Sequence, residues 1–444
     1  MINNLILYLL KMTSKFNFWF LFIVLSFATA AAEKAKTEIV KDGEKFSLYI
    51  NGVEVYLKGI NGLESSERAA LAANYGANAV RIYCHGPNET EWAIQRAYWA
   101  AQQNMYVMLY WDYLSMNAAD YTEEYKNRQK TQIRDFAERL KDIPNVFMIV
   151  IGNEMDHPKG TANIPATYQF VNELALIVKS VCPDKLVSTS VCTSGEISTL
   201  SRIADNAPDL DVLCLNIYAE LTDLLWIETA VKSSTWKGAY FISEWGDGAG
   251  HWSAPKTTWG ASIEKTSEEK RANIENLYNK VFKNQSQRCL GTFFFIWGSY
   301  WEYTPTWFSV FVEKNASVGI NGEQSASADA LHQCWKGTVP AQTAPVVTAI
   351  TIDDKTPASS IKVSANTNFT CSVTATDKEQ SLLTYKWEIL KDTGKSNARP
   401  GIVKSTNTNT TTFSVPETGN YRLYVYVLDG TGRVGTANTP FQVQ

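Results

Sequence analysis

Short apolar runs alternate with longer amphipathic segments from residue 46 to residue 337. Eight of these runs have the length and the branched or aromatic side chains typical of buried strands. They are Val55–Ile60, Ala79–Cys84, Tyr106–Trp111, Val146–Ile151, Leu186–Val191, Val212–Tyr218, Tyr240–Trp245 and Thr292–Trp297. Strands that alternate with helices build a parallel sheet, and eight of them close a barrel. The sequence therefore predicts an α/β fold, a (β/α)8 TIM barrel over residues 46–337.

The helical segments between these runs support the same architecture. They are expected at Glu91–Gln103, Glu123–Lys141, Pro165–Val181, Ser267–Phe282 and Ala326–Lys336. The competing architecture is a doubly wound open sheet, which usually has fewer strands and a glycine-rich phosphate loop after the first strand. Neither G-x-G-x-x-G nor G-x-x-x-x-G-K-[ST] occurs in the chain. The barrel is therefore the favoured prediction.

The composition changes after the last helical segment. Residues 338–344 read as a linker of small residues and proline, and residues 345–444 are rich in Thr and Val in short alternating runs. Turn clusters recur about every ten residues, which is typical of a small all-β sandwich of the immunoglobulin-like or PKD-like kind. Modules of this kind are more often spacers or packing partners than sugar binders, and we expect the same here.

The first thirty residues have the pattern of a secretory signal peptide. They contain Lys11 and Lys15, no acidic residue, an apolar stretch from Phe18 to Phe27 and then Ala28-Thr29-Ala30. An uncleaved membrane anchor is the alternative, but the apolar run is shorter than the roughly 20 residues that a spanning helix needs. We therefore expect a secreted or periplasmic protein with residues 1–30 removed and no membrane contact afterwards.

Charge and cysteine content narrow the classes of function. The formal net charge is −4, without the basic surplus of a nucleic-acid binder. The seven cysteines are odd in number and include no C-x-x-C pair, and the four histidines are scattered. This pattern favours neither a disulfide scaffold nor a metal cluster, although one disulfide remains open. We expect no metal, no cofactor and no nucleic-acid partner, and a monomeric chain.

Two carboxylates follow expected strands at the positions where TIM barrels carry their active sites. Glu154 follows the fourth strand and Glu244 ends the seventh. A pair of carboxylates is what hydrolysis of a glycosidic bond requires, because one protonates the leaving oxygen while the other attacks the anomeric carbon or activates water. The alternative is that each glutamate merely caps a helix or forms a salt bridge at the rim. No G-x-S-x-G elbow supports a serine nucleophile.

Three short motifs around these carboxylates resemble a known family. They are Gly152-Asn153-Glu154, Asn216-Ile217-Tyr218 and Ser243-Glu244-Trp245-Gly246. In this order they resemble the clan A glycoside hydrolases, which are retaining TIM-barrel β-glycosidases. The stretches from Gly250 to Gly260 and from Phe295 to Trp307 are most similar to secreted bacterial proteins with a family 2-type barrel. The N-terminal sandwich domains of family 2 β-galactosidases are absent here, so their substrate does not carry over.

The resemblance implies a role for each matching residue. Glu154 would be the general acid/base and Glu244 the nucleophile, with Arg81 and Tyr218 stabilising the charge of the nucleophile. Asn153 would bind the sugar 2-hydroxyl group. The remaining expected contacts to substrate come from Trp252 and Trp297, with Trp297 as the platform beneath the reacting sugar. Asp112 after the third strand and His85 after the second either line the site or only pair with neighbours.

The aromatic content points in the same direction. The chain has 14 Trp, 21 Tyr and 19 Phe, and such a surplus either fills cores or offers flat faces to ligands such as sugars. Trp residues 111, 245, 252, 259, 297, 301 and 307 fall at or just beyond expected strand ends. The expected function is a secreted retaining β-glycosidase acting on β-linked carbohydrate, with a slight preference for β-glucan. A β-glucan transglycosylase with the same residues and an inactive carbohydrate-binding or adhesion protein remain alternatives.

Overall fold

The computed structural model describes residues 36–156, 164–192, 197–218, 225–248, 250–283, 287–394 and 401–444. The expected signal peptide, residues 1–30, lies outside the described residues. Among the helices of the described ranges, none combines the length and the apolar character needed to cross a bilayer.

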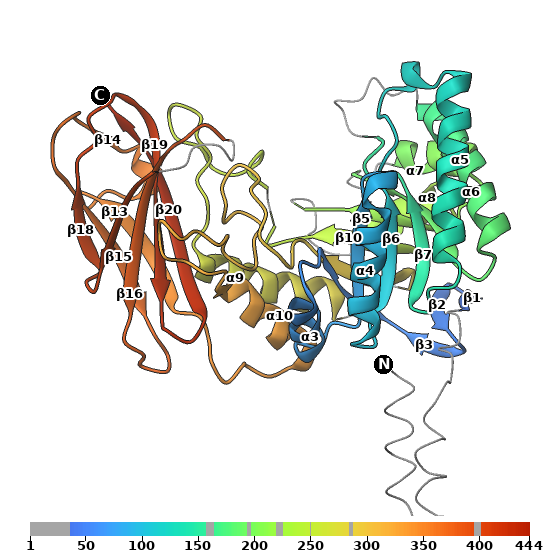
Figure 1. The fold of residues 1–444 in the computed structure, drawn as a ribbon, viewed down its shortest axis with the longest axis horizontal. Helices are drawn as coiled ribbons and strands as arrows, with labels where there is room; N and C mark the ends of the chain where they lie inside the picture. The colour runs from blue at the N-terminus through green and yellow to red at the C-terminus, as the bar shows by residue number, and fades with distance from the viewer. Residues whose placement is uncertain are drawn as a thin grey trace, which may run out of the picture. The chain divides into compact units, whose positions relative to one another are not determined.

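Eight parallel strands form a closed barrel in chain order, with β11 returning to pair with β4. The strands are β4 (Leu57–Asn61), β5 (Ala79–Cys84), β6 (Tyr106–Trp111), β7 (Val146–Ile151), β8 (Leu186–Val191), β9 (Val212–Asn216), β10 (Tyr240–Trp245) and β11 (Cys289–Phe294). A helix follows each strand, and Figure 1 shows α4, α5 and α6 outside β5 to β7. The predicted TIM barrel is confirmed.

The helices are α3 (Ser66–Asn74), α4 (Thr90–Ala101), α5 (Glu123–Leu140), α6 (Ile164–Val181), α7 (Ile197–Asn206), α8 (Leu225–Ser233), α9 (Ser267–Leu277) and α10 (Ala326–Lys336). A π-helical turn, Tyr278–Phe282, extends α9. Thr266 caps α9 through a capping box with Glu269, in which each side chain bonds the backbone N–H of the other residue. Local sequence therefore fixes where this helix begins.

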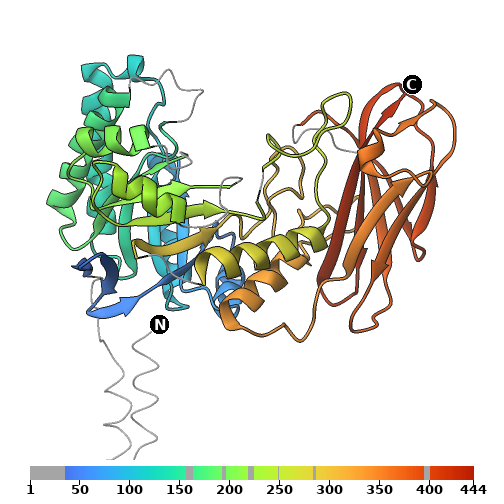
Figure 2. The same cartoon turned by 180° about the vertical axis from the view of Figure 1, so that it is seen from behind.

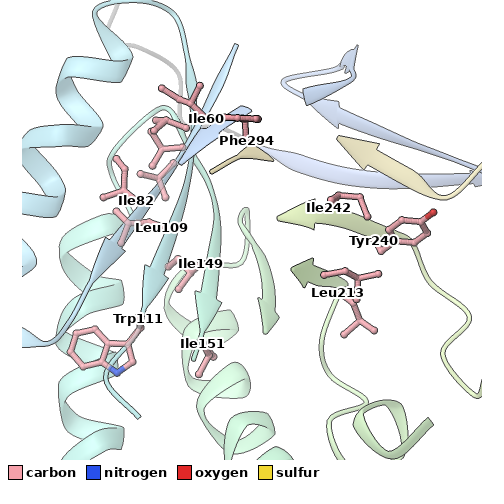
Figure 3. Close-up of a cluster of buried hydrophobic side chains, with 14 of the residues drawn as sticks. Ile60, Ile82, Leu109, Trp111, Ile149, Ile151, Leu213, Tyr240, Ile242 and Phe294 are labelled. Atoms are coloured by element: carbon pink, nitrogen blue, oxygen red, sulfur yellow. The ribbon is translucent and has the colours of Figure 1, made fainter. Parts of the chain in front are cut away.

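Alternation along the strands separates two apolar cores. Ile60, Ile82, Leu109, Ile149 and Ile242 point outward and pack under the helices, as the close-up in Figure 3 shows. The residues between them, among them Met108, Met148 and Phe241, fill the interior of the barrel. Successive side chains of a strand point to opposite faces, so the position of a residue in this alternation decides whether it can reach the mouth of the barrel.

A small antiparallel sheet precedes the barrel and was not expected from the sequence. It comprises β1 (Thr37–Asp42), β2 (Lys45–Ile50) and β3 (Val53–Val55). Leu48 and Ile50 are buried in the same apolar cluster as Leu57 and Phe147 of the barrel strands. The sheet therefore covers the end of the barrel opposite the carboxyl ends of the strands.

The C-terminal region forms two β-sheets that share one core. One sheet contains β13 (Val346–Ile352), β15 (Phe369–Thr376) and β18 (Thr410–Phe413). The other contains β12, β14, β16, β17, β19 and β20. Their bounds are Gln324–Ser325, Lys362–Val363, Thr384–Lys391, Ile402–Thr406, Gly419–Leu428 and Arg433–Val443. Buried side chains of both sheets, including Val373 and Trp387, pack together, as expected for a sandwich.

Strand pairing joins the barrel region to the sandwich, in addition to the linker between them. The short strand β12 lies just before α10, yet it pairs in parallel with β20 at the end of the sandwich. Figure 2 shows α9 and α10, in yellow and orange, side by side. A separate apolar cluster joins Val312 and Ile320, which follow β11, to Tyr424, Tyr426 and Val434 of the sandwich.

Candidate active site

Glu244 sits at the end of β10, where the pairing register with β9 and with β11 shifts. Such irregularities occur next to active sites, where they redirect a side chain. Its Oε1 accepts hydrogen bonds from Arg81 Nη1 at 2.5 Å and Tyr83 Oη at 2.6 Å, and its Oε2 accepts one from Tyr218 Oη at 2.8 Å. Three donors, one of them a guanidinium, stabilise the ionised carboxylate.

Arg81 and Tyr83 lie two residues apart on β5, so both point into the barrel. The Arg81 side chain is fully buried, and its guanidinium stacks over the ring of Tyr110 at 3.8 Å. Its second nitrogen, Nη2, donates to Asn153 Oδ1 at 2.7 Å. The cation is therefore fixed between the two predicted catalytic motifs.

Glu154 occupies a strained backbone position directly after β7. Its φ is +51°, in the left-handed region that residues other than glycine rarely adopt. Gly152, with φ +74°, allows the turn, because a Cβ at that position would lie 2.8 Å from the Met155 side chain. The chain thus holds the Glu154 carboxyl at the mouth rather than along the helix that follows.

The environment of Glu154 favours its protonated form. Burial, followed by the charge of Glu244, raises the pKa of Glu154 to about 7. A hydrogen bond from Asn216 Nδ2 to its Oε1, 2.8 Å long, acts in the opposite direction. The two carboxylates therefore differ in the way that an acid and a nucleophile must differ.

Asn216 connects the two motifs and was missed as a site residue. Its Nδ2 donates to Glu154 and, at 3.2 Å, to Asn153 Oδ1, while its own Oδ1 accepts from Ser243 Oγ at 2.7 Å and Ser190 Oγ at 3.0 Å. Strand alternation could have found it, since Asn216 lies two residues before Tyr218. The same signal would have found Tyr83 beside Arg81.

The side chain of Asn153 is held by its Oδ1 atom, which accepts hydrogen bonds from both Arg81 and Asn216. Its amide nitrogen is a donor, so a sugar hydroxyl group would meet a hydrogen-bond donor at this residue. The predicted contact with the 2-hydroxyl group stays a prediction.

Aromatic rings surround the Tyr218 side chain on the side of the loops after β10 and β11. The Tyr218 ring packs against Trp252, Phe295 and Phe308, with centroids 5.8, 6.4 and 5.6 Å away. We call these four residues the aromatic wall. The exposed fraction of Trp252 is 50%. The indole of Trp252 is therefore half exposed beside Tyr218, which contacts Glu244, and its predicted contact with a sugar stays a prediction.

Trp297 does not form the predicted platform. It is fully buried, its ring packs against Tyr75 and Phe311, and its Nε1 donates to the carbonyl of Arg68 at 3.0 Å. The reason is that β11 ends at Phe294, three residues earlier than expected. Phe294 points outward, so Phe295 is the residue that reaches the mouth, while Trp297 belongs to the core.

Two other tryptophans end their strands as expected, but their side chains do not reach the mouth of the barrel. Trp111 and Trp245 are fully buried and belong to the core beneath the helices. They occupy outward-facing positions of their strands, so lying at a carboxyl end was not sufficient to bring them to the mouth.

Asp112 follows β6 and pairs with a neighbour at the rim. Its Oδ2 lies 3.3 Å from Nδ1 of His85. Hydrogen bonding to Asp112 raises the pKa of His85, and the His85 ring stacks on Tyr83 at 5.8 Å. The structure therefore places Asp112 three contacts away from Glu244, through His85 and Tyr83, and its predicted contact with substrate stays a prediction. In the described part of the chain, no group of three His, Cys, Asp or Glu side chains is arranged to hold a metal ion.

Comparison with known proteins identifies the class to which this fold belongs. The structure resembles Bacteroides uniformis β-glucuronidase 2, with a TM-score of 0.50, 14% identity and coverage of 92% of this chain and 48% of that one. It also resembles a β-galactosidase candidate from Bacteroides fragilis, with a TM-score of 0.50, 13% identity and coverage of 92% and 57%. The chain shares the TIM-barrel fold of these proteins.

The comparison has two further results. This chain spans about half the length of those glycosidases. Its sequence matches no family model and no curated protein.

Proposed function

We propose that this protein is a secreted retaining β-glycosidase that cleaves β-linked oligosaccharides or polysaccharides. Glu244 acts as the nucleophile and Glu154 as the general acid/base. The observation that carries the proposal is the contrast between the two carboxyl groups: Glu244 receives three hydrogen bonds, while burial raises the pKa of Glu154 to about 7. The distant likeness to clan A glycosidases supports the same chemistry.

In the first step, Glu244 attacks the anomeric carbon while Glu154 gives its proton to the departing glycosidic oxygen. The bond between the anomeric carbon and that oxygen breaks, and an ester forms between the sugar and Glu244. Arg81 donates a hydrogen bond to Glu244 and holds its carboxyl group in place for attack. Asn153 donates to the sugar 2-hydroxyl group, a hydrogen bond that strengthens as the ring gains positive charge.

In the second step, Glu154 takes a proton from water, which attacks the anomeric carbon and releases Glu244. The change of role follows from the electrostatics of the site. Part of the raised pKa of Glu154 comes from the charge of Glu244. That charge disappears in the ester, so the pKa of Glu154 falls. Glu154, which has already given its proton to the leaving group, therefore stays ionised and can act as the base.

The substrate class is the least specific part of the proposal. The similar structures are described as a β-glucuronidase and a β-galactosidase candidate, and both names refer to a β-linked sugar. The aromatic wall suits the apolar face of a pyranose ring. We propose β-glucans as the first polymers to test.

A screen of β-1,3-, β-1,4- and β-1,6-linked glucans, galactans and mannans tests the proposal. Proton NMR within the first turnovers should show the β-anomer of the new reducing end. Products longer than the substrate would identify transglycosylation instead, and release of the α-anomer would contradict double displacement.

Two variants separate the two roles. Glu244→Gln should lose turnover on every substrate. Glu154→Ala should lose cleavage of natural glycosides but keep formation of the covalent intermediate from aryl glycosides with acidic leaving groups, because these need no proton. Equal loss on both kinds of substrate in Glu154→Ala would contradict its assignment as the acid.

A further inference from the structure

The C-terminal sandwich reaches the barrel through a buried arginine. Arg422 on β19 is fully buried and donates to Asn438 Oδ1 at 2.7 Å and Asp392 Oδ2 at 3.0 Å, both in the sandwich. Its Nη2 also donates to the backbone carbonyl of Ser262 in the barrel, at 2.9 Å. A buried guanidinium with several fixed acceptors holds its partners in one geometry.

Ser262 passes this constraint to the residue next to Trp252. Its backbone N–H donates to Tyr303 Oη at 2.7 Å, and its Oγ donates to the carbonyl of His251 at 2.8 Å. The His251 ring stacks on Tyr303, with centroids 5.0 Å apart and planes 8° apart, and Arg422 lies 5.3 Å from the same tyrosine ring. Both the backbone carbonyl and the ring of His251 are therefore held in place.

The rest of the loop has a second attachment to the sandwich. The N–H of Thr258 donates to Ser360 Oγ at 3.0 Å. Within the loop, backbone hydrogen bonds join Thr257 to Ala261 and Ile263 to Pro255. We refer to residues 250–263 as the tethered loop, because it joins the aromatic wall to the sandwich.

Trp252 is the part of the tethered loop that meets the active site. Half of its surface is exposed, and its ring edge packs against Tyr218, which donates to Glu244. If a loop that carries a large exposed ring must become ordered when sugar binds, the entropy lost by the loop weakens binding. A loop that is already fixed before binding therefore binds sugar more tightly.

We propose that the sandwich is a working part of the sugar-binding site and that Arg422 is a positioning residue, which acts through Ser262 and His251 to hold Trp252 against a bound sugar. This inference rests on the proposed function. It differs from a role as a spacer or a separate binding module, because the sandwich contributes support to the mouth of the barrel rather than a second sugar site.

The chain offers a matched control on the same interface. Arg433 on β20 also comes from the sandwich, donates to Asp329 Oδ1 at 2.5 Å and to Tyr75 Oη at 2.7 Å, and is buried. Its partners lie on α10 and just after α3, away from the tethered loop. Arg433→Lys therefore disturbs the interface without disturbing the predicted path to Trp252.

The test compares Arg422→Lys with Arg433→Lys in the full-length chain on a cleaved oligosaccharide. Arg422→Lys should raise KM about tenfold and leave kcat within about threefold, since binding is weakened and the catalytic groups are untouched. Trp252→Ala should show a similar rise, and the double variant should be no worse than Trp252→Ala alone. Arg433→Lys should keep the wild-type KM.

Hydrogen exchange of the tethered loop gives an independent readout. The amides of Thr257 and Ile263 should exchange faster in Arg422→Lys than in Arg433→Lys. Ser262→Ala, which removes the bond to His251 and keeps the arginine, covers the case in which Arg422→Lys does not fold. Wild-type KM and exchange in the folded variants would overturn the inference, as would an equal rise in KM for Arg433→Lys. If the wild type cleaves no β-linked sugar, the proposed function fails and the exchange comparison still decides the structural inference.

Discussion

The side-chain amide of Asn216 donates to Glu154 at 2.8 Å, while Tyr218, two residues further along the chain, donates to Glu244 at 2.8 Å. One short segment after β9 therefore contacts both carboxylates. Because each contact acts on a different group, substitutions there should separate the acid from the nucleophile.

The activity should fall as pH rises through about 7. Glu154 must carry a proton to act as the acid, and its pKa is raised to about 7. Measurement of kcat/KM from pH 5 to pH 9 should therefore show an alkaline limb near pH 7. A profile that stays flat to pH 9 would contradict the assignment of Glu154.

Asn216→Ala should move this alkaline limb to higher pH. The hydrogen bond from Asn216 favours the ionised form of Glu154, so its removal raises the pKa further. Ser190→Ala is the control, because it removes the hydroxyl group that bonds Asn216 Oδ1 and keeps the Ser190 backbone carbonyl, which accepts from the Glu154 N–H. A downward shift in Asn216→Ala would show that this hydrogen bond does not govern the acid.

Glu154→Gln should stabilise the fold at high pH. The folded state holds the proton of Glu154 more tightly than the unfolded chain, so this residue costs stability as pH rises from about 4.5 to about 7. The free energy of unfolding of Glu154→Gln, relative to wild type, should rise by about 3 kcal/mol between pH 4 and pH 8. Denaturant titrations at both pH values measure it, and no change between them would contradict the raised pKa.

Tyr218→Phe should reduce kcat/KM more than Tyr83→Phe. Tyr218 donates to Oε2 of Glu244, whereas Tyr83 shares Oε1 with Arg81, which remains as a donor after the substitution. Loss of a hydrogen bond to a charged group predicts a fall of about 10- to 100-fold for Tyr218→Phe. Single-turnover rates of formation of the covalent intermediate test this ranking of the two variants. A larger loss for Tyr83→Phe would contradict it and would show that the hydrogen bond to Oε1 matters more for attack than the one to Oε2.

Trp297→Phe and Phe295→Ala should have opposite consequences. Trp297 is buried and bonds Arg68, so its replacement should cost about 1–3 kcal/mol of stability with little change in KM. Phe295 packs at the mouth against Tyr218, so its replacement should raise KM. Thermal unfolding and steady-state kinetics on both variants distinguish them, and a rise in KM for Trp297→Phe alone would restore the original platform assignment.

Much of the barrel could be predicted because buried strands are nearly continuous apolar runs. The bounds of Ala79–Cys84 and Val146–Ile151 agree with those of β5 and β7. The sheet of β1 to β3 was missed because its strands are short, largely exposed and polar. Sequence proximity to a strand end was a good guide for Glu154 and Glu244 but a poor one for Trp297, because the end of β11 was misplaced by three residues.

The rest of the site depends on tertiary contacts that no local pattern contains. Asn216 and Tyr83 lie on the correct faces of their strands, but their importance becomes visible only when β5, β7, β9 and β10 are brought together. The link from Arg422 to Ser262 joins residues 160 positions apart. No periodicity within either segment indicates it.

The pairing of β12 with β20 has a consequence for how the protein is made. Asp329 must wait for Arg433, its partner 104 positions later, before the segment around β12 and α10 can be secured. The barrel strands, which carry both carboxylates, therefore precede the sandwich in synthesis, and the tethered loop gains its contact with Arg422 only after the sandwich has folded. A chain that stops before β19 would carry Glu154 and Glu244 with the tethered loop still unattached to Arg422.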